Sequence, residues 1–187
     1  MNYITILAAI IFSVTLNSCG GSDEKKAADT VAETASDAGL TVNNDEDKTG
    51  NFSFDDKSVS GKIETQYFGD KEKANFSVLC QHNESNDPSN SNFELLQITF
   101  INEKDATTNP ALKIYDGGSI LPMTEPEPGI VAVSLSGVGN GLGDQQFTGS
   151  EKSTGSITVK GRTVEIKDLS LFTREGAKKV INATLPF

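Results

Sequence analysis

Short segments in which every second residue is apolar fill residues 51–187, and this alternation restricts the fold more than any other feature of the chain. A period of two is the pattern of a β-strand with one buried face, whereas an amphipathic helix needs a period near 3.6. Phe76, Val78 and Cys80, for example, share one face of such a segment. No long stretch with helical periodicity interrupts the pattern, so residues 51–187 are expected to form a single all-β domain.

The strand-like segments are short and are separated by Gly, Asn, Asp and Pro, as turns require. Phe93–Ile101 is apolar on both faces, which predicts a central strand. About eight or nine short strands in one domain are typical of an antiparallel β-sandwich or a barrel. Segments with a strand-like pattern lie around Phe52–Phe54, Lys62–Phe68, Ala74–His82, Phe93–Ile101, Ala111–Tyr115, Ile130–Leu135, Gln145–Phe147, Ile157–Val159, Val164–Ile166 and Ile181–Phe187.

The C-terminal third contains the clearest hairpin. Lys160-Gly161 separates two alternating segments, and a two-residue turn there would pair Ile157 with Val164 on one face. The alternation of Ile181, Ala183, Leu185 and Phe187 then predicts a last strand within the sheet.

The N-terminus predicts export. Ile4–Leu16 is an uncharged stretch of 13 residues, which is too short to span a membrane and fits the hydrophobic region of a signal peptide. The motif Leu16-Asn17-Ser18-Cys19 resembles the lipobox of bacterial lipoproteins, from which only Asn17 departs mildly. The resemblance implies a signal peptide over residues 1–18, cleavage between Ser18 and Cys19, and a diacylglycerol on Cys19 with further acylation, such as palmitate, on its amine. An ordinary cleaved signal with an incidental cysteine, or an uncleaved anchor, are the alternatives.

Two or three acyl chains suffice for stable anchoring, so the resemblance places the protein at the outer membrane. Ser22-Asp23-Glu24 is similar to the acidic export signal of surface lipoproteins in Bacteroidetes. Exposure at the cell surface and orientation toward the periplasm both stay open.

Residues 19–50 comprise Cys19 and a polar linker. From Gly20 to Gly50, eight acidic residues face three lysines, and large apolar residues are scarce. Such a composition predicts a flexible acidic tether. Within it, Asp29-Thr30-Val31 resembles a short acceptor motif for O-linked glycans, which would place a glycan on Thr30.

Charge and composition exclude several classes of function. The formal net charge is -10 and the sequence pI is about 4.5, which argues against nucleic acid and against electrostatic docking on anionic lipid. His82 is the only histidine, which rules out multi-histidine zinc sites, and it is expected in an exposed loop. Cys80, the only thiol besides Cys19, is expected in the core rather than as a nucleophile.

No motif for catalysis, a metal or a cofactor is recognisable. The Gly137–Gly143 run lacks the lysine and the spacing of a phosphate-binding loop, so it predicts a flexible connection that could form part of a binding rim. The carboxylates are scattered, and the absence of Trp disfavours carbohydrate binding. We therefore expect a non-catalytic, lipid-anchored β-domain that binds an envelope or extracellular protein or a small ligand. An envelope hydrolase or isomerase, whose carboxylates converge only in the fold, and a structural spacer are the alternatives.

Overall fold

The computed structural model confirms an all-β fold and describes part of the chain. The described residues are 40–43, 48–68, 75–84, 92–108, 112–116, 118, 121, 127–139 and 141–187.

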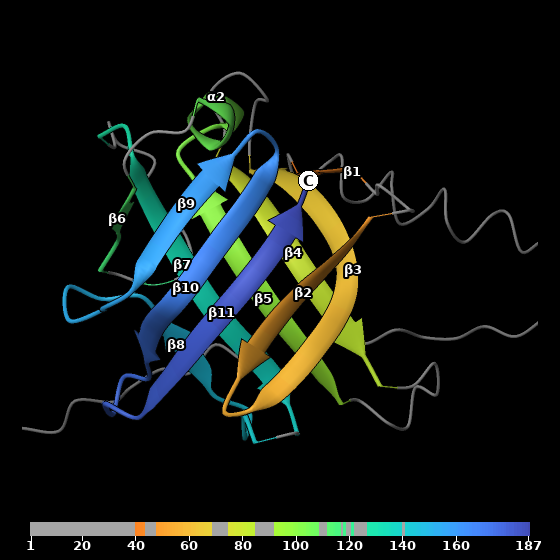
Figure 1. The fold of residues 1–187 in the computed structure, drawn as a ribbon, viewed down its shortest axis with the longest axis vertical. Helices are drawn as coiled ribbons and strands as arrows, with labels where there is room; N and C mark the ends of the chain where they lie inside the picture. Colours follow the sequence, from red (N-terminus) through yellow and green to blue (C-terminus); the bar gives the residue numbers. More distant parts are fainter. Residues whose placement is uncertain are drawn as a thin grey trace, which may run out of the picture.

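Eight antiparallel strands close into a barrel, and each strand pairs with the strands that precede and follow it along the chain (Figure 1). Pairing of the last strand, β11, with the first, β2, completes an up-and-down barrel, an arrangement that leaves few unpaired edges. The barrel strands are β2 (Thr49–Phe54), β3 (Lys57–Phe68), β4 (Asn75–Asn83), β5 (Phe93–Phe100), β7 (Ile130–Val138), β8 (Gln146–Thr148), β10 (Thr163–Phe172) and β11 (Lys178–Pro186).

Apolar side chains fill the barrel interior. In β3 the buried residues alternate with less buried ones, so Val59, Ile63 and Tyr67 all point inward. Eight strands enclose a space just wide enough for side chains or one small ligand, and here the inward residues pack into one continuous core. The alternation in the sequence therefore corresponds to side chains that point alternately into the barrel and out of it. β5 lies between β4 and β7, as its two apolar faces predict.

Within the described ranges, three further strands and one helix lie around the barrel. β1 (Leu40–Asn43) pairs with β3, and β6 (Lys113–Ile114) runs parallel to β7. β9 (Ser156–Lys160) pairs only with β10 among the described strands. Helix α2 (Glu103–Thr107) covers one end of the barrel, which we call the α2 end, while the β2–β3 and β10–β11 turns lie at the opposite end (Figure 1).

β8 is the shortest strand of the barrel and has the fewest paired positions. This strand has three residues, and its only paired position with β10 joins Thr148 to Phe172. Its other edge pairs with β7 over three positions. The outer surface at this point is therefore bordered by loops rather than by long neighbouring strands.

The hairpin between β9 and β10 has a different register from the predicted one. Val159 pairs with Val164, and the turn is formed by Gly161-Arg162 instead of Lys160-Gly161. Gly161 has a φ of +61° at the first turn position, where a two-residue hairpin favours glycine. The shift of two residues keeps the same apolar residues on the inner face, so alternation alone could not distinguish the two registers.

The barrel also begins before residue 51. Gly50, which the sequence analysis assigns to the linker, is buried in β2 and lies so close to β3 and β11 that a Cβ atom there would be 2.5 Å from Ile63 Cδ1 and 2.8 Å from Leu185 Cδ2. A glycine that suggests a linker in the sequence is here required by close packing. β1 likewise falls within the predicted linker.

Strand β10 continues six residues beyond Ile166, where the predicted strand ends. A bulge interrupts its pairing with β11 between Ile166 and Leu169, and Asp168 adopts a φ of +49°. Asn182 accepts a hydrogen bond from the Asp168 backbone N–H at 2.9 Å, which supports the bulge. The bulge breaks the alternation in the sequence and hides the second half of the strand.

Helix α2 has no counterpart among the predicted elements because it is only five residues long. The Asn102 side chain caps it by accepting a hydrogen bond from the Asp105 backbone N–H at 2.9 Å. The Asp105 carboxylate in turn accepts from the Gly129 backbone N–H at 2.7 Å, which fixes the helix to the start of β7.

Candidate functional site

The residues that the sequence singled out at the N-terminus, including Ser18, Cys19, Asp23 and Thr30, lie outside the described residues, as does most of the predicted linker. The lipid anchor, the export signal and the glycan site therefore stay predictions. Among the described residues, no helix is long and apolar enough to cross a membrane. No group of three or more potential metal ligands occurs in those ranges either.

Cys80 lies in the barrel core, as the sequence predicted. It is 0% exposed and faces the same side of β4 as Phe76 and Val78. Burial raises the pKa of its thiol to about 11, an effect that the backbone N–H groups of Gly61 and Gly50 offset in part. A thiol of that pKa is almost wholly protonated at neutral pH, which argues against a nucleophilic role.

His82 is not in an exposed loop, which corrects the prediction. It belongs to β4, is half-buried, and lies directly opposite Glu94 of β5. Strand β4 continues to Asn83 because β5 pairs with it over this length, so the polar run in the sequence begins later than expected.

A polar cluster occupies the barrel end opposite α2. Glu94 is 0% exposed and its carboxylate bonds to the Lys57 ammonium. Glu84 lies 3.9 Å from the same ammonium and accepts a hydrogen bond from Asn92 at 3.0 Å. The positive charge of Lys57 offsets the buried carboxylate of Glu94, so this ion pair is a structural feature of the barrel end.

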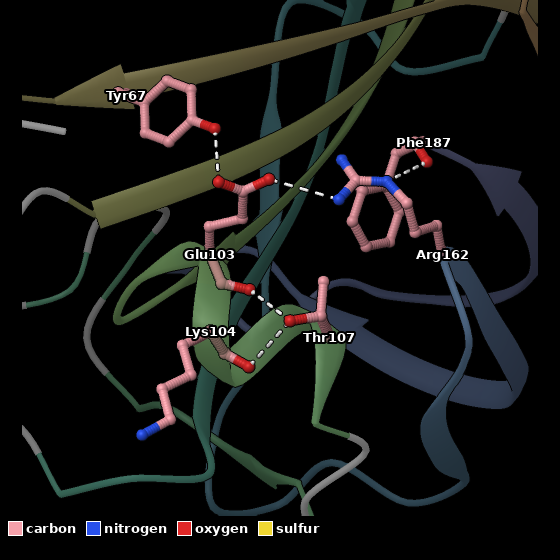
Figure 2. A network of polar contacts seen from close by, with 6 residues as sticks. All are labelled: Tyr67, Glu103, Lys104, Thr107, Arg162 and Phe187. Atoms are coloured by element: carbon pink, nitrogen blue, oxygen red, sulfur yellow. Dashed lines mark hydrogen bonds and ion pairs between the residues drawn. The ribbon is translucent and has the colours of Figure 1, made fainter. Parts of the chain in front are cut away.

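A second polar cluster fastens α2 to the barrel (Figure 2). Glu103 accepts a hydrogen bond from the Tyr67 hydroxyl at 2.7 Å and pairs with the Arg162 guanidinium at 3.2 Å. Arg162 also donates to the Phe187 carbonyl at 2.8 Å and lies 4.9 Å from the centre of the Phe187 ring. Thr107 donates back to the Glu103 carbonyl at 3.1 Å and stabilises the helix. We call Tyr67, Glu103, Arg162 and Phe187 the α2 clamp.

The electrostatics of the α2 clamp agree with a structural role. Burial raises the pKa of Tyr67 to about 12, and the hydrogen bond to Glu103 and the negative charge of Glu103 act in the same direction. Tyr67 therefore stays protonated and serves as a hydrogen-bond donor. The charged groups of the clamp bond to one another and to the backbone.

The third polar region is an open groove on the outer wall at β8. Its volume is about 870 Å³, which lies within the usual range of small-molecule sites. Segments that are distant in the sequence form it: the stretch after β6, the β7–β8 connection, β8 itself and the β10–β11 turn. We call it the β8 groove, and its lining residues include Asp116, Asp144, Gln146, Thr148, Phe172 and Arg174.

An aromatic ring lies on the wall of the β8 groove. Leu169 and Leu171 of β10 belong to the barrel core, so Phe172 points to the outside, and it lines the groove in a half-buried position. Phe147 of β8 is likewise in the core, which turns its neighbour Thr148 outward to face Phe172 in the paired position. The two outward side chains are therefore direct cross-strand neighbours on the outer surface at the short β8–β10 pairing.

Charged side chains border this ring and are not bonded within the described protein. Asp116, Asp144 and Glu175 supply three carboxylates and Arg174 one guanidinium, all exposed. None of the four takes part in an ion pair or side-chain hydrogen bond within the described ranges, in contrast to Arg162. Asp144 adopts a φ of +57° and directly follows the glycine-rich stretch Gly137–Gly143, none of whose described residues lines the groove.

A second, smaller hollow of about 250 Å³ adjoins the β8 groove. The two share Asp116, Ser150, Phe172, Thr173 and Arg174, and the smaller one continues toward Glu151 and Lys152. The surface therefore consists of two hollows that adjoin at these shared residues.

The sequence analysis missed this site. The bulge in β10 conceals in the sequence which way Phe172 points. A Phe one residue after an inward Leu, followed by the turn Thr173-Arg174-Glu175-Gly176, is the signal that could have indicated an outward aromatic residue.

Comparison with known proteins adds no assignment: no protein-family model matches this chain, and neither a curated protein nor a solved structure does so. The function must therefore be argued from the geometry of the residues.

Proposed function

We propose that this protein is a lipid-anchored envelope protein whose barrel binds a ligand in the β8 groove without transforming it. The observation that carries the proposal is the combination of an open hollow of ligand size with an outward aromatic ring and four charged groups that bond to nothing else in the described protein. Loops on a rigid barrel are a common location for recognition because the strands hold them in place.

The interior and the two other polar clusters favour this choice. Apolar side chains fill the barrel core, Glu94 is compensated by Lys57, and the α2 clamp is bonded internally. The buried Cys80 is unsuited to nucleophilic chemistry at neutral pH. Recognition at the outer wall is therefore the activity that the arrangement supports best.

Binding in the β8 groove is tested with the purified full-length chain in detergent. A small-molecule library is screened by ligand-observed NMR, and each hit is repeated with Phe172→Ala and with Val180→Ala. Val180 is an exposed apolar residue of β11 outside the groove, so it is a matched control. We expect hits that weaken with Phe172→Ala alone. Hits that are indifferent to Phe172→Ala, or no hits at all, would contradict the proposal.

Lipid anchoring is tested separately by Cys19→Ala. Without the thiol that carries the diacylglycerol, the protein should move from the membrane fraction to the soluble fraction. Cys80→Ala is the matched control, because its thiol is buried in the core and should leave fractionation unchanged. Retention of Cys19→Ala in the membrane fraction would exclude the lipid anchor.

The location of the domain is tested by digesting intact cells with a protease, with a periplasmic protein as a marker. Digestion while the marker survives indicates exposure at the cell surface, as the acidic segment Ser22-Asp23-Glu24 suggests. Digestion only after the envelope is opened indicates the periplasmic side.

A hydrolase or isomerase is a second candidate because carboxylates from distant segments do converge. Asp116 and Asp144 line the same groove although they are far apart in the sequence. If they act as acid and base, Asp116→Asn and Asp144→Asn should abolish turnover of a bound ligand while binding persists. Hits from the screen that stay chemically unchanged on long incubation would exclude this candidate.

A further inference from the structure

The chemistry of the β8 groove points to one class of ligand. We infer that the groove binds a neutral carbohydrate longer than a single ring, an inference that rests on the proposed binding function. The reasons are the aromatic ring, the mixture of hydrogen-bonding groups, the excess of negative charge and the presence of two adjoining hollows.

The aromatic ring fits one face of a sugar. Phe172 is half-buried and faces outward beside Thr148, so part of the ring surface is open to a ligand. One face of a pyranose carries mainly C–H groups, which have a slight positive charge and pack on the negative face of an aromatic ring. Phe172 has no hydroxyl or N–H of its own, so it can offer only this apolar contact.

The groups around the ring match an array of hydroxyls. Gln145 and Gln146 provide amides, Thr148 and Ser150 provide hydroxyls, and Arg174 provides a planar set of N–H donors. A sugar hydroxyl both donates and accepts, so it needs neighbours of both kinds. The groove contains three kinds of group: those that only donate hydrogen bonds, those that only accept them, and those that do both. A purely ionic ligand would instead need charges of one sign.

The charge of the groove disfavours anionic ligands. The β8 groove has three carboxylates, from Asp116, Asp144 and Glu175, against the single guanidinium of Arg174. The adjoining hollow adds Glu151 and Lys152, which cancel. The excess of negative charge repels phosphate, sulfate or uronate groups. Because the net charge of the two hollows is negative, a cationic ligand is the competing class, and the polycations in the test below examine it.

The shape favours more than one sugar ring. The two hollows, of about 870 and 250 Å³, share the Phe172 and Arg174 positions, and the smaller one is also lined by Glu151 and Lys152, which do not line the larger one. A ligand stacked on Phe172 can therefore continue into the second hollow. Both hollows lie on the outer wall, so the ends of a long chain could pass into solvent.

The test is affinity electrophoresis of the purified full-length chain through gels that contain one polysaccharide each. The panel contains neutral glucans, mannan and xylan, the anionic polymers pectin and heparin, and the cationic polymers chitosan and polylysine. Each gel is run at low and at high salt, because salt screens ionic binding and leaves neutral stacking and hydrogen bonding almost unchanged. We expect retardation by at least one neutral polysaccharide at both salt concentrations.

Variants then locate the site. Phe172→Ala should weaken the retained affinity at least about tenfold, and Phe172→Trp should preserve it because it restores the aromatic face. Arg174→Ala should weaken it as well, whereas Lys104→Ala, which removes an exposed cation of α2, should have no effect. Thermal unfolding of each variant shows that the barrel is intact.

The outcomes separate the two proposals. Retardation by polyanions or polycations alone, lost at high salt and on Phe172→Ala, would overturn the assignment to a neutral carbohydrate and retain the binding function of the groove. Retardation by a neutral polysaccharide that persists in both Phe172→Ala and Arg174→Ala would overturn the assignment of the site. No retardation by any neutral polysaccharide would overturn the carbohydrate inference, and the library screen would then decide on the groove.

Discussion

Arg162 and Arg174 are the only arginines in the chain, and they lie at opposite ends of the barrel in opposite situations. Arg162 at the α2 end bonds to Glu103 and to the Phe187 carbonyl and covers the Phe187 ring. Arg174 lines the β8 groove together with Phe172 and forms no such bond within the described residues. One arginine thus completes the fold at its end of the barrel, whereas the other is left open to solvent.

This difference shows how an internal contact can be told from a recognition surface. A structural arginine stabilises the protein because its donors are satisfied by the protein. An arginine that is held at the rim of a groove with an aromatic neighbour contributes little to folding, so its effect must be sought in binding. The comparison predicts large stability effects at the α2 clamp and small ones at the β8 groove.

The largest effect is expected at Phe187. Its ring is 1% exposed and packs on Phe76 with ring centres 5.6 Å apart. Phe187→Ala should lower the free energy of unfolding by about 3–5 kcal/mol, because it opens a cavity in the core and removes the support of Arg162. Urea denaturation measures the change. A loss below about 1 kcal/mol would mean that the α2 end is not part of the cooperative core.

Arg162→Ala should have the next largest effect, a loss of about 1–2 kcal/mol, since it removes a charged hydrogen bond and a partly exposed ion pair. Arg174→Ala is the matched control and should change the stability by less than about 0.5 kcal/mol. Urea denaturation of the two variants under identical conditions measures the contrast. Equal losses of unfolding free energy in the two variants would contradict the distinction between a structural Arg162 and a non-structural Arg174.

The pH dependence of the α2 clamp follows from Tyr67. Its pKa is raised to about 12 from the ordinary value of 10, so the folded state keeps the proton that the unfolded state releases. The contribution is fully present below pH 10 and is lost as the pH rises from about 10 to 12. Denaturation at several pH values should therefore show a steeper alkaline loss in the natural protein than in Tyr67→Phe. Parallel profiles would indicate that Tyr67 is not buried as described.

The smallest effect is expected from the carboxylates of the β8 groove. Asp144 is exposed and has a positive φ, a conformation that asparagine also tolerates. Asp116→Asn with Asp144→Asn should change the free energy of unfolding by less than about 0.5 kcal/mol. Thermal unfolding checks the double variant. A larger loss would show that these carboxylates have a structural partner and would weaken the case for a ligand site.

The sequence alone determined the class of the fold because inward and outward residues of a barrel wall alternate with the period of the strand. The pattern at Phe76, Val78 and Cys80 was sufficient to predict a buried face and a buried thiol, and both are present. The N-terminal motif around Cys19 likewise predicts an anchor through local chemistry that needs no fold.

Tertiary structure alone decided the register, the closure of the barrel and the groove. The two possible registers of the β9–β10 hairpin bury the same residues, so the turn geometry of Gly161 was needed to distinguish them. The direction of Phe172 depends on a bulge near Asp168, and its approach to Asp116 and Asp144 depends on pairings between distant strands. Alternation records which side of the wall a residue occupies, whereas only the pairing of strands determines which residues meet there.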